Sequence, residues 1–163
     1  MPIRPMTRPQ WLRFAGNLVN LSTPAGLLVA AVGRARCETR PGGLFLCEGY
    51  RLPFPVAGAF TVGNVITTAG RWADLLSRNP DLLRHEERHT WQWLYCAGVG
   101  FLPAYGVCLA WSVLRTGDRA AANFFERSAG LAIGGYQDLP VRPVSEGVRA
   151  VLGRTAGRLR SRS

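Results

Sequence analysis

The sequence predicts an α+β fold on the basis of three stretches. Residues 43–68 are enriched in β-branched and aromatic side chains between glycines and prolines, which is typical of short strands. Residues 80–94 and 118–129 each begin with residues that cap helices. We therefore expect a small antiparallel sheet, over about residues 43–68, that packs on two helices and is accompanied by apolar, membrane-associated helices.

Length and composition favour one folded domain. The chain has 163 residues, of which 47% are hydrophobic and 18% are charged, so it can bury a core and is not disordered. We expect residues 1–140 to form this domain. The chain becomes rich in proline and arginine beyond Tyr136, and we expect residues 141–163 to be a flexible basic tail.

The net charge of +10 indicates an affinity for polyanions, which are either anionic lipids or nucleic acids. All 20 basic residues are arginines spread over both ends and the loops, and no nucleic-acid-binding motif accompanies them. We expect an anionic membrane surface as a partner, and no nucleic acid. The expected location is a bacterial cytoplasmic membrane, on a side that the sequence does not assign, with the cytoplasm as the alternative.

The first apolar run covers residues 14–33 and follows a segment that carries Arg4, Arg8 and Arg13. This is the layout of a signal peptide, but several polar residues interrupt the run and no small-residue cleavage site closes it. Pro24 also disfavours one continuous transmembrane helix. We expect two short pieces here.

The four cysteines lack the C-x-x-C spacing of a cysteine zinc site. Cys37 and Cys47 flank the turn residues 41–43, so they could face each other across a hairpin. A disulfide between them needs an oxidising compartment. The spacing allows this bond without deciding whether it forms.

The stretch from Leu83 to Leu94 carries the only two histidines of the chain. His85 and His89 are four residues apart, so on a helix they share one face and can direct two nitrogens at one point. Glu86 supplies a carboxylate that can accept a proton from the attacking water without binding the metal. The stretch Asn79-Pro80-Asp81 is a typical helix start. A zinc site is favoured over the alternative, a pair of surface histidines on a charged helix.

A catalytic zinc needs a third protein ligand besides the two histidines. Glu126 is the best candidate, because it lies on an expected helix and small residues follow it. Asp118 and Asp138 are the alternatives, and Asp118 is more simply explained as a helix N-cap. The competing interpretation of Glu126 is a surface glutamate.

A second apolar run, Leu94 to Leu114, separates these ligands and is long enough to cross a bilayer. A single crossing would place Glu126 on the opposite side from the histidines. Glycine and proline residues within the run allow a bend, at Gly98, Gly100, Pro103 and Gly106. We therefore expect a helical hairpin, buried or dipping into one leaflet, instead of a span.

These motifs resemble the gluzincin metallopeptidases, and most closely the minigluzincins and the membrane-bound heat-shock and prenyl-protein peptidases. Residues 58–61 with 65–67 are similar to the strand that precedes their zincin-type HExxH helix, and residues 126–129 are similar to their E-x-x-A segment. The similarity covers roughly residues 58–130. His89-x-x-Gln92 resembles a variant motif of other gluzincin-like proteins. Gly130 departs from the pattern, because these families usually have an aspartate there that orients a zinc-bound histidine.

The resemblance implies zinc-dependent hydrolysis of a peptide or protein substrate. Zinc would be held by His85, His89 and Glu126, and Glu86 would accept the proton of the attacking water. The edge strand around residues 60–64 would pair with an extended substrate. Tyr136 is our choice for the donor to the oxyanion, followed by Tyr105 and Arg127, although a buried structural role also suits each tyrosine.

Two other functions remain open from the sequence. Gly130 favours a catalytically inactive metal-binding or structural membrane-associated protein of the same fold, because loss of a carboxylate behind a ligand weakens metal sites. The net charge favours a basic surface-binding protein in which the HExxH motif is fortuitous.

Overall fold

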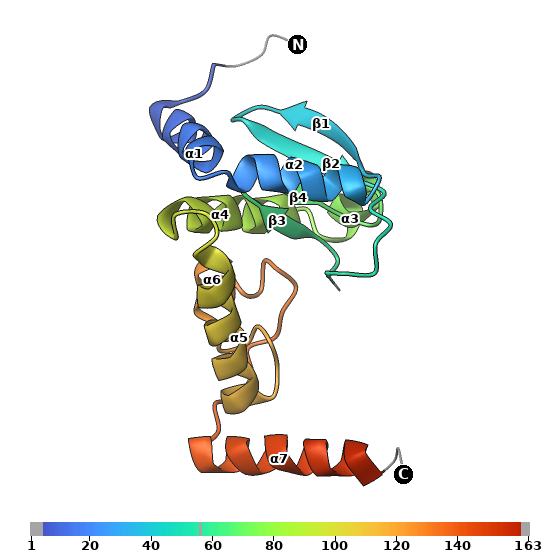
Figure 1. Cartoon of the computed structure of the whole chain (residues 1–163), viewed down its shortest axis with the longest axis vertical. Coiled ribbons are helices and arrows are strands. Elements are labelled where there is room, and N and C mark those ends of the chain that lie inside the picture. The colour runs from blue at the N-terminus through green and yellow to red at the C-terminus, as the bar shows by residue number, and fades with distance from the viewer. Residues whose placement is uncertain (1–4, 56, 161–163) are drawn as a thin grey trace. The chain divides into compact units, whose positions relative to one another are not determined.

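The computed structural model describes residues 5–55 and 57–160, which form seven helices and four strands (Figure 1). The chain divides into two compact units, Met1–Pro103 and Ala104–Ser163. The elements are, in order, α1 (Arg8–Val19), α2 (Ser22–Val32), β1 (Arg36–Arg40), β2 (Leu44–Glu48), β3 (Phe60–Val62), β4 (Val65–Thr67), α3 (Trp72–Arg78), α4 (Leu82–Tyr95), α5 (Phe101–Thr116), α6 (Phe124–Ala129) and α7 (Val144–Arg160). The predicted α+β class is confirmed.

The sheet of the first unit is mixed, with the strand order β1-β2-β4-β3. The pairs β1–β2 and β3–β4 are antiparallel hairpins, whereas the central strands β2 and β4 are parallel. The prediction of an antiparallel sheet over residues 43–68 was therefore wrong about the central pair, and it omitted β1. The parallel pairing arises because the chain passes through a long loop and β3 before β4 joins β2, and local sequence patterns do not encode such a crossover.

Helices cover both faces of this sheet (Figure 1). Leu44, Leu46 and Ile66 are buried on one face with Trp72 of α3, and leucines at the start of α4 pack there. Ala30 of α2 packs against the opposite face, on Cys47 and Val65. Because side chains alternate between the two faces along β2 and β4, α3 and the start of α4 pack on one face and α2 packs on the other.

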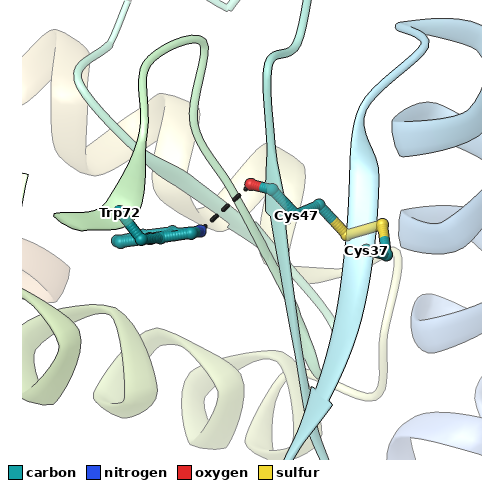
Figure 2. Close-up of a disulfide and its surroundings, with 3 residues drawn as sticks. All are labelled: Cys37, Cys47 and Trp72. Carbon is teal, nitrogen blue, oxygen red and sulfur yellow. Dashed lines mark hydrogen bonds between the residues drawn. A yellow bond between two sulfur atoms is a disulfide. The ribbon is translucent and has the colours of Figure 1, made fainter.

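A disulfide joins Cys37 of β1 to Cys47 of β2 (Figure 2). The two residues are directly opposite in the antiparallel register, and their Cα atoms are 4.0 Å apart. The indole nitrogen of Trp72 donates a hydrogen bond of 3.1 Å to the carbonyl oxygen of Cys47. The pairing that the spacing allowed is therefore present, and it is continuous with the core under β2.

The first apolar run forms two helices, as expected, and α1 meets α2 at an angle of 71°. The break lies at residues 20–21, and Pro24 instead occupies the first turn of α2, where proline is tolerated. Gly26 lies so close to the sheet that a Cβ atom there would be 2.4 Å from the Val62 carbonyl oxygen. No described helix is by itself long and apolar enough to cross a membrane, although α1 and α2 together would satisfy length and composition as a bent pair.

The second apolar run is also interrupted, between the end of α4 and the start of α5. Ala97 and Gly98 have positive φ angles of 52° and 79°, which end the helix. The expected bend is thus present at residues 96–100, whereas Pro103 and Gly106 lie within α5. The expected return as a hairpin and the placement in a membrane stay predictions.

The second unit differs from the expected helix over 118–129. Helix α6 begins only at Phe124, with Asn123 as its N-cap, and the Asn123 side chain accepts from the Phe125 N–H at 3.0 Å. Asp118 instead caps a turn by accepting from the N–H groups of Ala120 and Ala121 at 2.7 and 2.9 Å. Helix α7 occupies residues 144–160, within the segment that we expected to be a flexible basic tail.

Candidate metal centre

Helix α4 carries the HExxH motif and buries it. The helix begins at Leu82 with Asp81 as its N-cap, so the expected cap Asn79 instead ends α3. This difference of two residues is usual for helix ends. The buried residues of α4 are mostly polar: His85, Glu86, His89, Thr90, Gln92 and Trp93. The leucines of α4 are only half-buried. A helix that buries its polar groups more completely than its leucines is unusual, and it points to a site.

The two histidine side chains converge, as their spacing predicts. Their Nε2 atoms lie 3.1 Å apart, and their exposed fractions are 2% for His85 and 7% for His89. Two nitrogens at this separation would bind one zinc ion at about 2.0–2.1 Å with an angle of about 95–100° at the metal, near the tetrahedral value. The same separation also suits a hydrogen bond between two neutral imidazoles. The pair can therefore exist without metal and can accept one without a large rearrangement.

The other ring nitrogen of His89 also has a polar partner. His89 Nδ1 lies 2.7 Å from Oε1 of Gln92, one helical turn further along α4. Gln92 is only 8% exposed. Histidines that bind metals usually have such a hydrogen bond behind them, which fixes the ring.

Glu86 is buried next to the histidines and is bonded to the sheet. The hydroxyl of Thr61 in β3 donates to Glu86 Oε2 at 2.7 Å. The carbonyl oxygen of Thr61 accepts in turn from the indole N–H of Trp93 at 2.8 Å. Edge strand β3 is therefore hydrogen-bonded to α4 at two points, one within the motif and one beyond its C-terminal end.

Glu126 lies in the first turn of α6 and is 3% exposed. The hydroxyl of Tyr105 in α5 donates to Glu126 Oε1 at 2.6 Å. Burial raises the pKa of Tyr105, and the negative charge of Glu126 raises it further. The tyrosine therefore stays protonated and can only donate to this carboxylate.

His85, His89 and Glu126 are each buried, and each offers an atom that could bind a metal ion. The alternative third ligands have other partners. Asp118 caps its turn, and the exposed Asp138 forms an ion pair with Arg127 at 2.8 Å. Glu126 is thus the buried one of the three candidate carboxylates, and its place in one site with the two histidines stays a prediction.

The predicted oxyanion donors lie in the second unit. Tyr136 is 40% exposed and lines a small pocket of about 200 Å³ together with Arg127, Leu131, Ala132 and Asp138. The hydroxyl of Tyr105 binds Glu126, and the guanidinium of Arg127 binds Asp138 and the Ala121 carbonyl. The assignment of Tyr136 as the donor stays a prediction.

Two polar residues had no assigned role in the sequence analysis. Gln92 could have been found, because its spacing of three from His89 places both on one helical face. The only sign of Thr61 in the sequence was the resemblance of its strand to a family motif, since no local pattern brings β3 to Glu86.

Comparisons with family models, with curated proteins and with solved structures gave no match. A proposal of function therefore depends on these side chains alone.

Proposed function

We propose that the protein is a zinc-dependent metallopeptidase. The observation that carries the proposal is the buried pair of histidine Nε2 atoms, 3.1 Å apart, with the carboxylate of Glu86 on the same helix. His85, His89 and Glu126 would hold the ion. Two imidazoles and one carboxylate are a ligand set typical of catalytic zinc, which keeps a fourth position for water or substrate.

When bound, zinc would polarise the scissile carbonyl and lower the pKa of a water molecule. Glu86 would accept a proton from the attacking water as the water oxygen bonds to the carbonyl carbon. The same carboxyl then gives the proton to the nitrogen as the C–N bond breaks, which releases one acid and one amine. The Thr61 hydroxyl binds Oε2 of Glu86, so Oε1 would be the oxygen that accepts the proton.

Strand β3 is an edge strand, which is what pairing with an extended substrate requires. Val62 and Val65 flank the two-residue turn, so they form the close hydrogen-bonded pair, and Thr61 directs its backbone groups to the open edge. The Thr61 carbonyl already accepts from Trp93. A substrate would therefore use the Thr61 N–H as its main anchor on β3.

The second candidate is a metal-binding protein without activity, which Gly130 favours. This residue ends α6 with a φ angle of 96° and offers no carboxylate to a histidine. Gln92 weakens this argument, because it supplies a hydrogen bond behind His89 from another position. We therefore prefer the peptidase.

The test is the metal content of the purified protein, followed by hydrolysis of an unstructured protein substrate. We expect one zinc per chain, with loss of zinc in His89→Ala and Glu126→Ala. Asp138→Ala is the matched control, because it removes a carboxylate of the same unit that we exclude as a ligand, and it should keep the zinc. No bound metal in the wild type would refute the site, and bound zinc without hydrolysis would favour the inactive protein.

A further inference from the structure

We propose that Gln92 is a positioning residue that presets His89 for metal binding by fixing its tautomer. The proposal rests on the proposed metal site. It assigns to an uncharged amide the task that a carboxylate performs in many histidine metal sites. The observation behind it is the contact of 2.7 Å between Gln92 Oε1 and His89 Nδ1.

The chemistry of the two groups determines where the proton lies. An amide oxygen only accepts hydrogen bonds, so Nδ1 of His89 must carry the N–H. A neutral imidazole has a single N–H, and Nε2 is therefore left with its lone pair. This is the form in which Nε2 can bind a metal without first losing a proton.

The histidine pair then becomes asymmetric in the metal-free protein. His89 Nε2 is an acceptor, and it lies 3.1 Å from His85 Nε2. The hydrogen bond at this distance needs a donor, so His85 carries its proton on Nε2. When a metal binds, His85 must move that proton to Nδ1, whereas His89 keeps its tautomer.

Burial makes the amide a suitable partner. Gln92 and His89 are 8% and 7% exposed, so water competes little for the hydrogen bond. A carboxylate at the same place would increase the basicity of His89 more strongly, but it would bring a charge into the interior. The amide orients the ring without this cost.

The direct test is nitrogen NMR of the imidazoles in the wild type at pH 8, without metal and with one equivalent of zinc. We expect His89 as the Nδ1–H tautomer in both samples, and His85 as Nε2–H without metal and Nδ1–H with zinc. His89 found as Nε2–H in the metal-free protein would refute the proposal, because the amide nitrogen of Gln92 would then be the donor. This measurement needs no variant.

Variants test the consequence for affinity, measured by competition with a zinc chelator. Gln92→Leu keeps the volume and removes the acceptor, so zinc should bind about 10 to 100-fold more weakly. Gln92→Glu restores an acceptor and should recover the affinity. Thr90→Val is the matched control, because Thr90 is buried on the same helix and bonds to the Glu87 carbonyl. Its zinc affinity should change by less than about twofold.

Different results would refute the metal site and the role of Gln92. A wild type that binds no zinc refutes the proposed function. Unchanged zinc affinity in folded Gln92→Leu refutes only the positioning role of Gln92. An equal loss in Gln92→Leu and Gln92→Glu would also refute it, because a purely structural defect does not recover with a new acceptor.

Discussion

Thr61 and Glu86 are joined by a hydrogen bond of 2.7 Å between a hydroxyl and a carboxylate oxygen, although 24 residues separate them in the chain. The hydroxyl can reach this carboxylate because β3 lies against α4, where Trp93 also bonds to the Thr61 carbonyl. Strand and helix together thus set the direction of the proposed proton acceptor.

The first prediction concerns Thr61→Val, which keeps the shape and removes the hydroxyl. A hydrogen bond to a charged group contributes about 1.5–3 kcal/mol, so turnover should fall about 10-fold or more as Glu86 loses its orientation. Zinc content should not change. Thr61→Ser is the control and should retain most of the activity, and equal rates in the Val and Ser variants would contradict the role.

The second prediction is that Glu86→Gln binds zinc normally and hydrolyses nothing. The substitution preserves the size of the side chain but removes the proton acceptor, which typically contributes 10²–10⁴-fold to the rate. Glu87→Gln is a suitable neighbour control, since Glu87 faces Arg13 and not the histidines. Comparable activity in wild type and Glu86→Gln would disprove the peptidase mechanism.

The third prediction concerns Arg13, whose side chain is completely buried between α1 and α4. Its guanidinium donates to Glu87 at 2.7 Å and to the Gly42 carbonyl, and it lies over the Trp91 ring at 5.7 Å. Arg13→Ala would leave these groups without their partner, so we expect a loss of about 3 kcal/mol in the free energy of unfolding.

Arg40→Ala provides the comparison for that measurement. Arg40 and Glu38 are an exposed pair at 3.7 Å. Exposed pairs contribute little, so this variant should change stability by less than about 1 kcal/mol. Urea denaturation of both variants separates the loss of a buried arginine from the loss of an exposed one, and similar losses would contradict the structural role of Arg13.

The sequence was most informative where a feature is local. The i, i+4 spacing predicted that His85 and His89 converge, and the glycines after α4 predicted the bend in the second apolar run. Pro24 predicted that the first run divides into two pieces, but the break lies at residues 20–21 and not at the proline. Parallel pairing of β2 with β4 was missed, because it depends on the path of a loop and not on strand composition. Helix α6 was predicted too long, because Asp118 is an equally good cap for a turn and for a helix.

In the candidate site, too, the sequence predicted local features and missed those that depend on tertiary packing. Glu126 was selected from chemistry, since a zinc site needs a third ligand, and not from any contact visible in the sequence. Gln92 lies within one helical turn of His89 and was accessible to pattern analysis. The Thr61 contact comes from tertiary packing between β3 and α4, which a single sequence does not show.

The fourth prediction concerns Asp118 and pH. Partial burial alone would raise the pKa of Asp118, but hydrogen bonds from the Ala120 and Ala121 N–H groups outweigh it and hold the pKa below its usual value. A lowered folded-state pKa gives stability that is present above the unfolded pKa and is lost as pH falls through the folded one. Asp118→Ala should therefore lower the free energy of unfolding by about 1 kcal/mol at pH 7. Thermal melts should show this difference shrinking below about pH 4, and a difference independent of pH would contradict it.

The fifth prediction concerns the disulfide between Cys37 and Cys47, which closes a short loop across the β1–β2 hairpin. Such a closure limits the unfolded chain, so its removal should lower the free energy of unfolding by about 2–3 kcal/mol. Reductant should lower the melting temperature of the wild type to that of Cys37→Ala/Cys47→Ala, and it should not change the double variant. The double variant therefore shows any effect of the reductant that does not involve the Cys37–Cys47 bond. Because Cys47 lies in the core beside Ala30 and Val65, the loss should loosen β2, and hydrogen exchange of the β2 amides reports it. Unchanged melting of the wild type in reductant would show that the bridge does not contribute to stability.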